Sequence, residues 1–322
     1  MDFNIVILVV TFVIAAIAGI FVIPILKNLG VGQSEREEGP QSHLKKQGTP
    51  TMGGIIMVIA VVISVIITYI YNQEIAKKLI PIALAAIGFG LIGFLDDYKK
   101  VVLKNTDGIS PKAKMLGLLI ISVLYIVYLM KFGNVSTDIV IPFFKTSITL
   151  PVWIYIPFTI LVMLATTNAV NLTDGVDGLA TTVSCIIVAT LAVIGISLYF
   201  SEVAILGSIV CGACLGFLIY NMNKAKVFMG DTGSLFLGGI ISCMAIYLEM
   251  PLLLLIIALV PVCETLSVIM QVAYYKKTKK RIFKMTPIHH HFELSGWKET
   301  KVVRVFSGVT LILCIIGVIS VL

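Results

Sequence analysis

The sequence predicts an all-α, polytopic integral membrane protein with about ten transmembrane helices. Of its 322 residues, 58% are hydrophobic and only 13% are charged, whereas an ordinary soluble domain carries about 25% charged residues. Ten apolar runs approach or exceed the roughly 20 residues that cross the hydrocarbon layer. Because lipid offers the backbone no hydrogen-bond partner, runs of this length must be helices rather than irregular chain or barrel strands.

The predicted spans follow one another along the whole chain. The first comes after Met-Asp rather than a basic segment and has no small-residue cleavage site behind it, so we expect a retained span. Between the fourth and fifth spans, Pro142 and Pro151 bracket the alternating residues 146–149, which predicts a small external hairpin. We place the ten spans at about residues 3–26, 52–71, 79–95, 115–130, 152–170, 179–199, 203–220, 234–248, 252–275 and 302–322.

The connections between the spans differ in charge. The loops between the spans alternate between the two sides of the membrane. Of the 24 Lys and Arg residues, 20 lie on one side, and only Lys77, Lys78, Lys131 and Lys145 lie on the other. The side rich in Lys and Arg faces the cytoplasm, and an even number of spans then puts both termini outside. We therefore predict a single transmembrane domain, residues 1–322, whose chemistry lies in the cytoplasmic loops 27–51, 96–114, 171–178, 221–233 and 276–301.

Charge and cysteine usage exclude several other classes. The net charge of +7 does not indicate nucleic-acid binding, because the basic residues flank membrane segments, and the expected partner is the lipid bilayer. All six cysteines lie in apolar runs, and none is near another with metal-type or framework spacing. Neither a zinc site nor a disulfide scaffold is therefore indicated. Gly88, Gly90 and Gly93 match a dinucleotide fingerprint, but no strand precedes them, so we interpret them, like Gly212 and Gly216, as helix-packing positions.

Two adjacent carboxylates, Asp96 and Asp97, end the third predicted span. Charge is expensive at that depth, and the carboxyl end of a helix is itself negative, so a cationic partner is expected. Neighbouring side chains on a helix diverge, so one could meet a metal or an attacking group while the other meets a lysine. The alternative is a solvated helix end that Lys99 and Lys100 neutralise.

A second polar segment follows the fifth span. Asn168 and Asn171 lie one turn apart at the inner end of an apolar helix, which favours a functional role. The loop after them contains Asp174, Gly175 and Asp177, and its glycines allow close approach of a ligand to the backbone. An ordinary polar turn is the alternative.

A third segment, residues 221–234, ends with Asp231 between Gly230 and Gly233 just before a predicted helix. A helix N-terminus favours phosphate oxygens, but a carboxylate there would repel them unless a divalent cation lay between. The alternative is that Asp231 and Ser234 only cap the helix.

Two further segments carry basic side chains. His289, His290 and His291 suit phosphate binding or substrate positioning better than zinc, which prefers well-spaced ligands. Lys45 and Lys46, before a glycine-rich segment, would hold an anionic substrate or lipid headgroups. Taken together, carboxylates from three loops beside lysines and histidines predict magnesium-assisted phosphoryl transfer at the inner membrane face.

Five of these segments, in this order, resemble the motifs of the polyprenyl-phosphate N-acetylhexosamine-1-phosphate transferases. The triple histidine resembles the muramoyl-pentapeptide branch of that family in particular. The matching segments are residues 46–54, 94–98, 171–180, 227–234 and 287–293.

The resemblance implies transfer of phospho-N-acetylmuramoyl-pentapeptide from its UDP conjugate to undecaprenyl phosphate, with release of UMP and Mg²⁺ as cofactor. The product would be the first lipid intermediate of peptidoglycan synthesis, made in the bacterial inner (plasma) membrane with the active site facing the cytoplasm. Whether the protein forms a homodimer is left open. The alternatives are an N-acetylglucosamine-1-phosphate transferase acting on UDP-N-acetylglucosamine or, from another class, a transporter or lipid flippase.

The resemblance also implies roles for single residues. Asp231 would be the principal magnesium ligand, Asp96 the base or the partner of the carrier phosphate, and Asp97 its neighbour in the catalytic centre. Phe228 would stack on uracil. The other implied nucleotide-sugar and phosphate contacts are Lys46, Lys100, Lys112, Asn168, Asn171, Asp174, Gly175, Asp177, Asn221, His289, His290 and His291.

The ninth predicted span contains two polar residues that share a face, Glu264 and Gln271. Polar groups inside a span usually face the protein interior. We expect Gln271 to bind substrate at the border of a lipid groove, with polar contacts between helices as the alternative for both residues.

Overall fold

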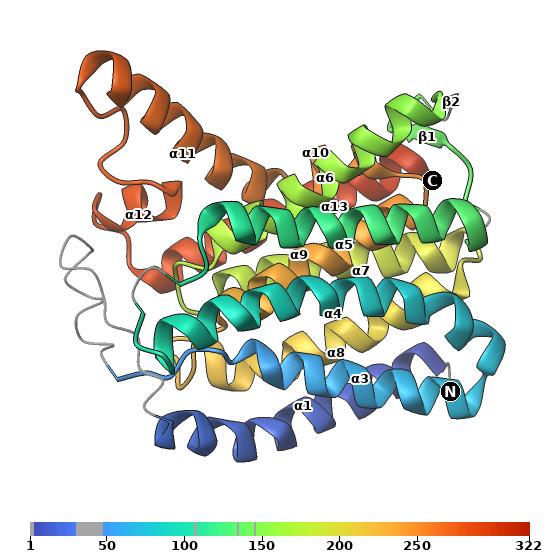
Figure 1. The fold of residues 1–322 in the computed structure, drawn as a ribbon, viewed down its shortest axis with the longest axis horizontal. Helices are drawn as coiled ribbons and strands as arrows, with labels where there is room; N and C mark the ends of the chain where they lie inside the picture. The colour runs from blue at the N-terminus through green and yellow to red at the C-terminus, as the bar shows by residue number, and fades with distance from the viewer. Residues whose placement is uncertain (1–2, 30–47, 106–107, 134, 145) are drawn as a thin grey trace.

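The computed structural model describes residues 3–29, 48–105, 108–133, 135–144 and 146–322. The chain forms a bundle of long helices with one small antiparallel hairpin (Figure 1). Its elements are α1 (Phe3–Asn28), α3 (Gly54–Tyr71), α4 (Gln73–Val101), α5 (Pro111–Phe132), β1 (Asp138–Ile141), β2 (Thr146–Thr149), α6 (Val152–Thr173), α7 (Leu179–Ser197), α8 (Ser201–Asn221), α9 (Gly230–Tyr247), η1 (Pro251–Leu253), α10 (Leu254–Ile257), α11 (Leu259–Thr278), α12 (Ile288–Glu293) and α13 (Glu299–Val321).

The number of spans is lower than predicted. Within the described residues, eight helices are long and apolar enough to cross a membrane, or up to nine if one bent pair counts as a span. The polytopic, helical class is therefore confirmed, and the number ten is wrong by this measure. The predicted span 234–248 corresponds to α9, which is not among these helices because it begins with Gly230, Asp231, Thr232 and Gly233.

The centre of the bundle is α9. Every residue from 232 to 246 is buried, and α3, α4, α6 and α7 pack around it (Figure 1). The approach is close because glycines face each other: a Cβ at Gly93 would lie 2.1 Å from Asp231 O, and one at Gly54 would lie 2.2 Å from Gly233 N. The interpretation of Gly93 as a packing position is thus confirmed, and Gly212 likewise packs against the backbone of α1.

The predicted span 252–275 is not continuous. Its place is taken by η1 with α10, and then α11, and the two parts meet at an angle of 82°. The proline at position 261 has no N–H and its ring would clash with the carbonyl four residues earlier, which belongs to Ile257, the last residue of α10. The break allows α11 to diverge from the bundle (Figure 1). The chain then returns to α12, which packs against the first half of α11 at Glu264.

The bundle has two different ends. Both described chain termini and the β1–β2 hairpin lie at one end, whereas α12 and the carboxyl end of α4 lie at the other (Figure 1). The hairpin between α5 and α6 was predicted, and it pairs Asp138 with Thr149 in antiparallel register. The N–H of Val140 donates to the carbonyl of Glu249 at 2.8 Å, which ties the hairpin to the bundle. All six cysteines are free, as predicted.

Candidate functional site

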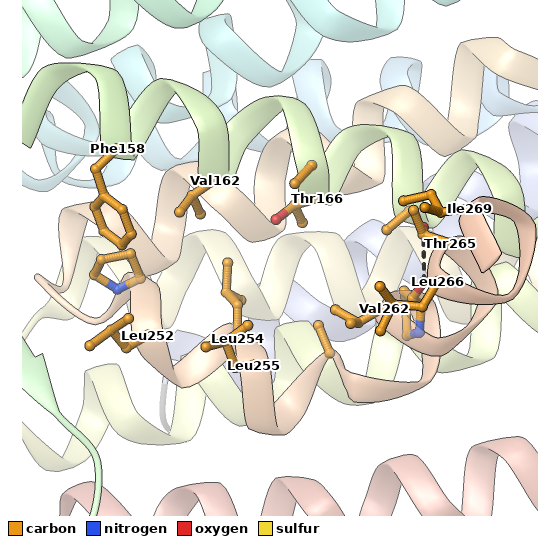
Figure 2. A pocket seen from close by; sticks show the side chains of 15 residues that line it. Phe158, Val162, Thr166, Leu252, Leu254, Leu255, Val262, Thr265, Leu266 and Ile269 are labelled. Carbon is orange, nitrogen blue, oxygen red and sulfur yellow. Dashed lines mark hydrogen bonds between the residues drawn. The ribbon is translucent and has the colours of Figure 1, made fainter. Parts of the chain in front are cut away.

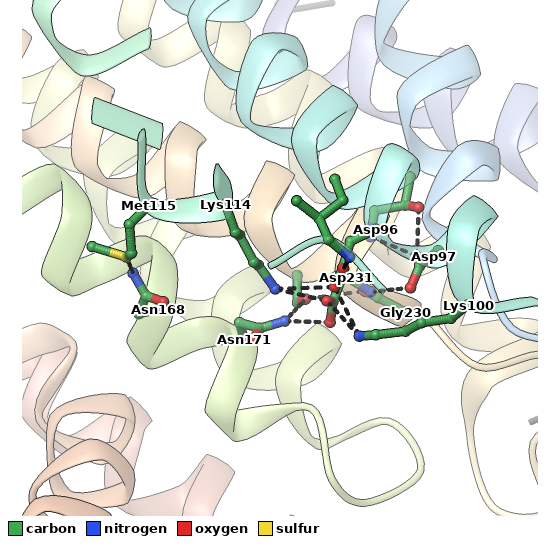
Figure 3. A network of polar contacts seen from close by, with 12 residues as sticks. Asp96, Asp97, Lys100, Lys114, Met115, Asn168, Asn171, Gly230 and Asp231 are labelled. Atoms are coloured by element: carbon green, nitrogen blue, oxygen red, sulfur yellow. Dashed lines mark hydrogen bonds and ion pairs between the residues drawn. The ribbon is translucent and has the colours of Figure 1, made fainter. Parts of the chain in front are cut away.

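Four helix ends bring the predicted acidic residues together. Asp231 is in the first turn of α9, Asp96 and Asp97 are near the carboxyl end of α4, and Asn171 is in the last turn of α6. The first turn of α5 adds Lys114. In Figure 3 the side chains of Lys100, Lys114 and Asn171 point toward Asp231.

The carboxylate of Asp231 is the hub of this polar network. Lys114 Nζ lies 2.7 Å and Lys100 Nζ 3.3 Å from its Oδ2. The amide of Asn171 donates to its Oδ1 at 2.8 Å and also to the hydroxyl of Ser234 at 2.8 Å. Asp231 is therefore held by two cations and an amide, and capping of its own helix is only part of its environment.

Asp96 shares the same lysines. Its Oδ2 lies 2.7 Å from Lys100 Nζ and 3.5 Å from Lys114 Nζ, and its Oδ1 accepts from the N–H of Ile109 at 2.7 Å. Its side chain is 4% exposed. Two carboxylates and two ammonium groups thus balance each other. Ammonium groups are also partners for diphosphate oxygens, so a bound diphosphate would compete with the carboxylates for the lysines.

Asp97 has a different task from its neighbour. Its carboxylate accepts from the N–H groups of Asp231 and Thr232 at 3.1 and 2.9 Å, and from the hydroxyl of Thr232 at 2.6 Å. It thus caps the N-terminus of α9 from another helix, where the positive end of the dipole favours a carboxylate. Gly230 has φ +73°, and a Cβ there would lie 2.6 Å from Asp97 Oδ2, so this close approach requires glycine.

Asp174 follows the end of α6 and faces the same negative charges. Burial raises the pKa of its carboxyl group to about 8, and the charges of Asp231 and Asp97 add to the increase. The N–H of Gly230 opposes the shift by donating to it. Asp174 therefore carries its proton over most of the neutral range unless a cation enters the site.

Three residues predicted to bind substrate use their polar groups within the fold. Asp177 accepts from the N–H of Ala225 at 3.0 Å. Asn221 accepts from Thr181 and donates to the carbonyl of Val227. Gln271 accepts from the N–H groups of residues 282 and 283 and donates to the carbonyl of residue 283. These contacts support loops around the site, and direct substrate binding by the three stays a prediction.

Two other predicted substrate contacts are better placed to meet a ligand. Phe228 is half-buried, and its backbone is fixed by hydrogen bonds with Pro50 and Gly53, both at 2.8 Å. Its ring is not part of the buried core. Asn168 donates to the carbonyl of Leu164 at 2.7 Å, which leaves its amide oxygen for other partners.

The three histidines point in different directions. His289 is fully buried, and its Nδ1 lies 3.1 Å from Glu264 Oε2. His290 Nδ1 lies 2.7 Å from Glu293 Oε2, and His291 Nδ1 accepts from the N–H of Lys284 at 3.1 Å. Gly175 lies against His289, since a Cβ there would be 2.1 Å from Nε2. Gly175 is therefore a packing position that joins the 174–178 loop to α12.

Three other lysines, besides Lys100, differ in their position relative to the carboxylates. Lys46 lies outside the described residues. Lys112, predicted to hold phosphate, is exposed at the start of α5. Lys114 was not predicted as a site residue, although it contacts both Asp96 and Asp231. Residues two apart on a helix face different ways, so the helical phase of α5 could have shown that only one of these two lysines reaches the carboxylates.

An apolar cavity of about 300 Å³ lies beside this site, between α6 and the broken helix formed by α10 and α11 (Figure 2). Thr166 and Ala169 on α6 line it, and Asn171 of the polar network is on the same helix, half a turn beyond. From the other wall come Pro261, Thr265 and other, mostly apolar residues. The cavity could hold hydrocarbon but offers almost no partner to a charged group.

The donor atoms fit Mg²⁺ better than zinc. In the part of the chain that the structure describes, no group of three or more His, Cys, Asp or Glu side chains could hold a metal by itself. Mg²⁺ usually takes one or two protein carboxylates and completes its shell with water and substrate phosphates. The carboxylate of Asp231 could take that role once Lys100 and Lys114, which now neutralise it, turn to the substrate phosphates.

Comparison with known proteins identifies the family of the chain. Residues 79–249 match the family described as glycosyl transferase family 4. The chain is 51% identical over 317 residues to the phospho-N-acetylmuramoyl-pentapeptide-transferase of Staphylococcus epidermidis, covering 98% of this chain and 97% of the relative. The enzymes of that name from Clostridium kluyveri and Acetivibrio thermocellus are 49% and 46% identical, over 97% and 96% of this chain and 97% and 92% of the relatives.

Proposed function

The chain belongs to the phospho-N-acetylmuramoyl-pentapeptide-transferases of glycosyl transferase family 4, and we propose that it transfers phospho-N-acetylmuramoyl-pentapeptide from its UDP conjugate to undecaprenyl phosphate. UMP leaves, and the first lipid intermediate of peptidoglycan synthesis forms. The observation that carries the proposal is the convergence of Asp96, Lys100, Lys114 and Asn171 on Asp231. One diphosphate linkage replaces another, so no other energy source is needed.

The contacts of the carboxylates suggest a division of roles. Both oxygens of Asp97 accept backbone N–H groups of α9, so we assign Asp97 to positioning Asp231. Asp96 accepts one backbone N–H and contacts Lys100 and Lys114, so we assign it as the base or the partner of the carrier phosphate. Lys100 and Lys114 would hold the phosphate oxygens that the reaction brings between them.

The proposal includes Mg²⁺, held by Asp231 with Asn171 beside it. When bound, the ion neutralises the charge of the diphosphate and makes the UMP phosphate a better leaving group. Asp174 would then face a cation as well as two carboxylates, which favours its charged form. All of these residues come from one chain, so the chemistry does not require the homodimer that the sequence left open.

The lipid substrate fits the position of the site. The apolar cavity between α6 and α11 has the chemistry that a polyprenyl chain requires, and the polar network at the end of α6 has the chemistry of its phosphate. We further propose that this end of the bundle faces the cytoplasm of a bacterial cell, because the connections there hold most of the Lys and Arg residues.

The proposal can be tested with purified protein in detergent. Undecaprenyl phosphate, Mg²⁺ and labelled UDP-MurNAc-pentapeptide should give UMP and a labelled lipid. Asp231→Asn should abolish the reaction, whereas the matched change Asp138→Asn in the exposed hairpin should not. Turnover of UDP-N-acetylglucosamine instead would assign the other branch of the superfamily, and passage of intact substrate across vesicles without UMP release would indicate a transporter.

A further inference from the structure

A buried acid–imidazole pair lies outside the network around Asp231. Glu264 on α11 and His289 on α12 are both completely buried, with Glu264 Oε2 3.1 Å from His289 Nδ1. The same oxygen accepts from the backbone N–H of His289 at 3.3 Å. Glu264 thus holds the backbone of the first histidine of the triplet by a hydrogen bond and lies in close contact with its ring.

The pair connects two parts of the site that are far apart in sequence. On its other side, the His289 ring lies against Gly175, where a Cβ would be 2.1 Å from Nε2. Gly175 follows Asp174, whose carboxyl group faces Asp231 and Asp97. A continuous chain of contacts therefore runs from α11 through His289 to the loop beside Asp231.

Glu264 also lies next to the apolar cavity along the chain. The following residues, Thr265 and Leu266, line that cavity. Because α11 bends away after α10, its position relative to the 174–178 loop is set by its contacts with α6, α12 and α13. The Glu264–His289 contact is one of them, and it joins the helix that forms a cavity wall to the loop beside the acidic network.

Stability alone does not explain such a pair. Burying a carboxylate costs several kcal/mol, and apolar replacements of buried ion pairs are often neutral or stabilising. Within the described residues, the second oxygen of Glu264 and both ring nitrogens of His289 have no hydrogen-bond partner, so the two side chains of the pair lie 3.1 Å apart without a hydrogen bond between them. Its geometry serves the alignment of α12 with the loop.

We propose that Glu264 is a positioning residue, which through His289 and Gly175 aligns the cavity for the carrier lipid with the loop of the nucleotide-sugar site. The proposal rests on the proposed function. Since misalignment of two bound reactants slows their reaction more than it weakens the binding of either, loss of Glu264 should act on kcat.

The test compares Glu264→Ala with Glu202→Ala. Glu202 is a matched control, because it is also a buried carboxylate in a helix and accepts from Tyr247 at 2.7 Å, but at the opposite end of the bundle. Glu264→Ala should lower kcat roughly 10- to 100-fold, while UMP binds with full stoichiometry and within about threefold of the wild-type affinity. Glu264→Gln, whose amide oxygen can accept the same backbone N–H of His289, should recover most of kcat.

A double-mutant cycle tests whether Glu264 acts on kcat through His289 or independently of it. In a His289→Ala background, Glu264→Ala should cause a smaller loss than in the wild type, because the side-chain contact is already gone and only the hydrogen bond from the backbone N–H is left to break. A normal kcat in Glu264→Ala, a loss of UMP sites in proportion to activity, or additive effects in the cycle would each overturn the positioning role. If the wild-type protein binds UMP but forms no lipid product, the proposed transferase activity fails instead.

Discussion

Asp231 shows how single residues define this site. A carboxylate that is largely withdrawn from water is costly, yet this one, 18% exposed, has two ammonium groups and an amide around it, contributed by α4, α5 and α6. The lysines that neutralise it are the natural partners for phosphate oxygens when a cation takes over the carboxylate. When substrate binds, the lysines can pair with its phosphate oxygens while a cation pairs with the carboxylate. No charged group in the network is then left without a partner.

The first prediction concerns the two lysines at the start of α5. Lys114→Met removes an ammonium group 2.7 Å from Asp231 and should lower kcat by about 100-fold or more, in the range seen when one charge-stabilising group is lost. Lys112→Met removes an exposed lysine from a different face and should stay within a few-fold of wild type. Steady-state UMP release measures both, and equal losses would show that the helical phase does not decide their roles.

The second prediction concerns pH and stability. The pKa of Asp174 is raised from 3.8 to about 8 by burial and by neighbouring negative charges. Between these values the unfolded chain has released the proton that the folded chain keeps, so the free energy of unfolding falls as pH rises through this window. Above about pH 8 this loss is complete.

Asp174→Asn cannot ionise and should escape that loss. Its melting temperature relative to wild type should therefore rise from pH 5 toward about pH 8, when both proteins are measured in detergent with EDTA. The chelator matters because a cation beside Asp231 would lower the pKa of Asp174. A difference that does not change with pH would show that the carboxyl group is not shifted.

At the residue scale, the sequence identifies the carboxylates that the structure brings together, but not the side chains and N–H groups that they contact. The Asp96–Asp97 doublet and the glycines around Asp231 are visible as unusual groups at helix ends. That Asp97 caps α9 and that Glu264 meets His289 could not be predicted, because each contact depends on how helices distant in sequence pack. Lys114 was missed because the positive-inside pattern explains every lysine on that side equally well.

At the scale of elements, close helix packing positions the acidic residues. The main-chain carbonyl of Asp231 lies where a side chain at Gly93 would be, so α4 and α9 approach at backbone distance. This distance allows the Asp97 carboxylate on α4 to reach the N–H groups that begin α9. The same contact keeps Asp96 and Asp231 beside their shared lysines.

The third prediction tests this packing. Gly93→Ala places a Cβ 2.1 Å from a backbone oxygen that cannot rotate away, so it should cost about 1–3 kcal/mol of stability and most of the activity. Gly308→Ala on α13 is the control, since a Cβ there meets nothing within 4 Å. Melting temperature and UMP release are measured for both. A Gly93→Ala protein as stable and active as the control would contradict the close approach of α4 and α9.

Sequence periodicity predicted most helices, but it did not predict the enclosure of α9 or the break before α11. An apolar run indicates a span, yet α9 begins with four polar or glycine residues and is enclosed by other helices. The break before α11 was missed because a proline within an apolar run is also compatible with a kinked, continuous span. Tertiary packing decides between these outcomes.

At the scale of the whole molecule, the two ends of the bundle differ in chemistry. One end carries the chain termini and the hairpin, and the other carries the acidic network, α12 and the basic end of α11 (Figure 1). A substrate dissolved in water and one that stays in the membrane could meet only where polar loops and helix ends adjoin lipid. The network at the ends of α4, α6 and α9 meets this requirement.

The fourth prediction tests the orientation in intact cells. Single cysteines are introduced at exposed positions, as Ser147→Cys in the hairpin and Lys280→Cys after α11, with the exposed Cys263 replaced by Ser. A membrane-impermeant maleimide should label the first in intact cells and the second only after permeabilisation. The opposite pattern would invert the topology and place the acidic network outside the cytoplasm.

The transfer itself is tested most directly by following each phosphate of the donor. UDP-MurNAc-pentapeptide is labelled in the phosphate next to uridine or in the one next to the sugar, and reacted with undecaprenyl phosphate and Mg²⁺. The account predicts that the sugar-side label enters the lipid product while the uridine-side label stays in UMP. Transfer of both labels to lipid, or retention of the sugar-side label in water-soluble products, would contradict it.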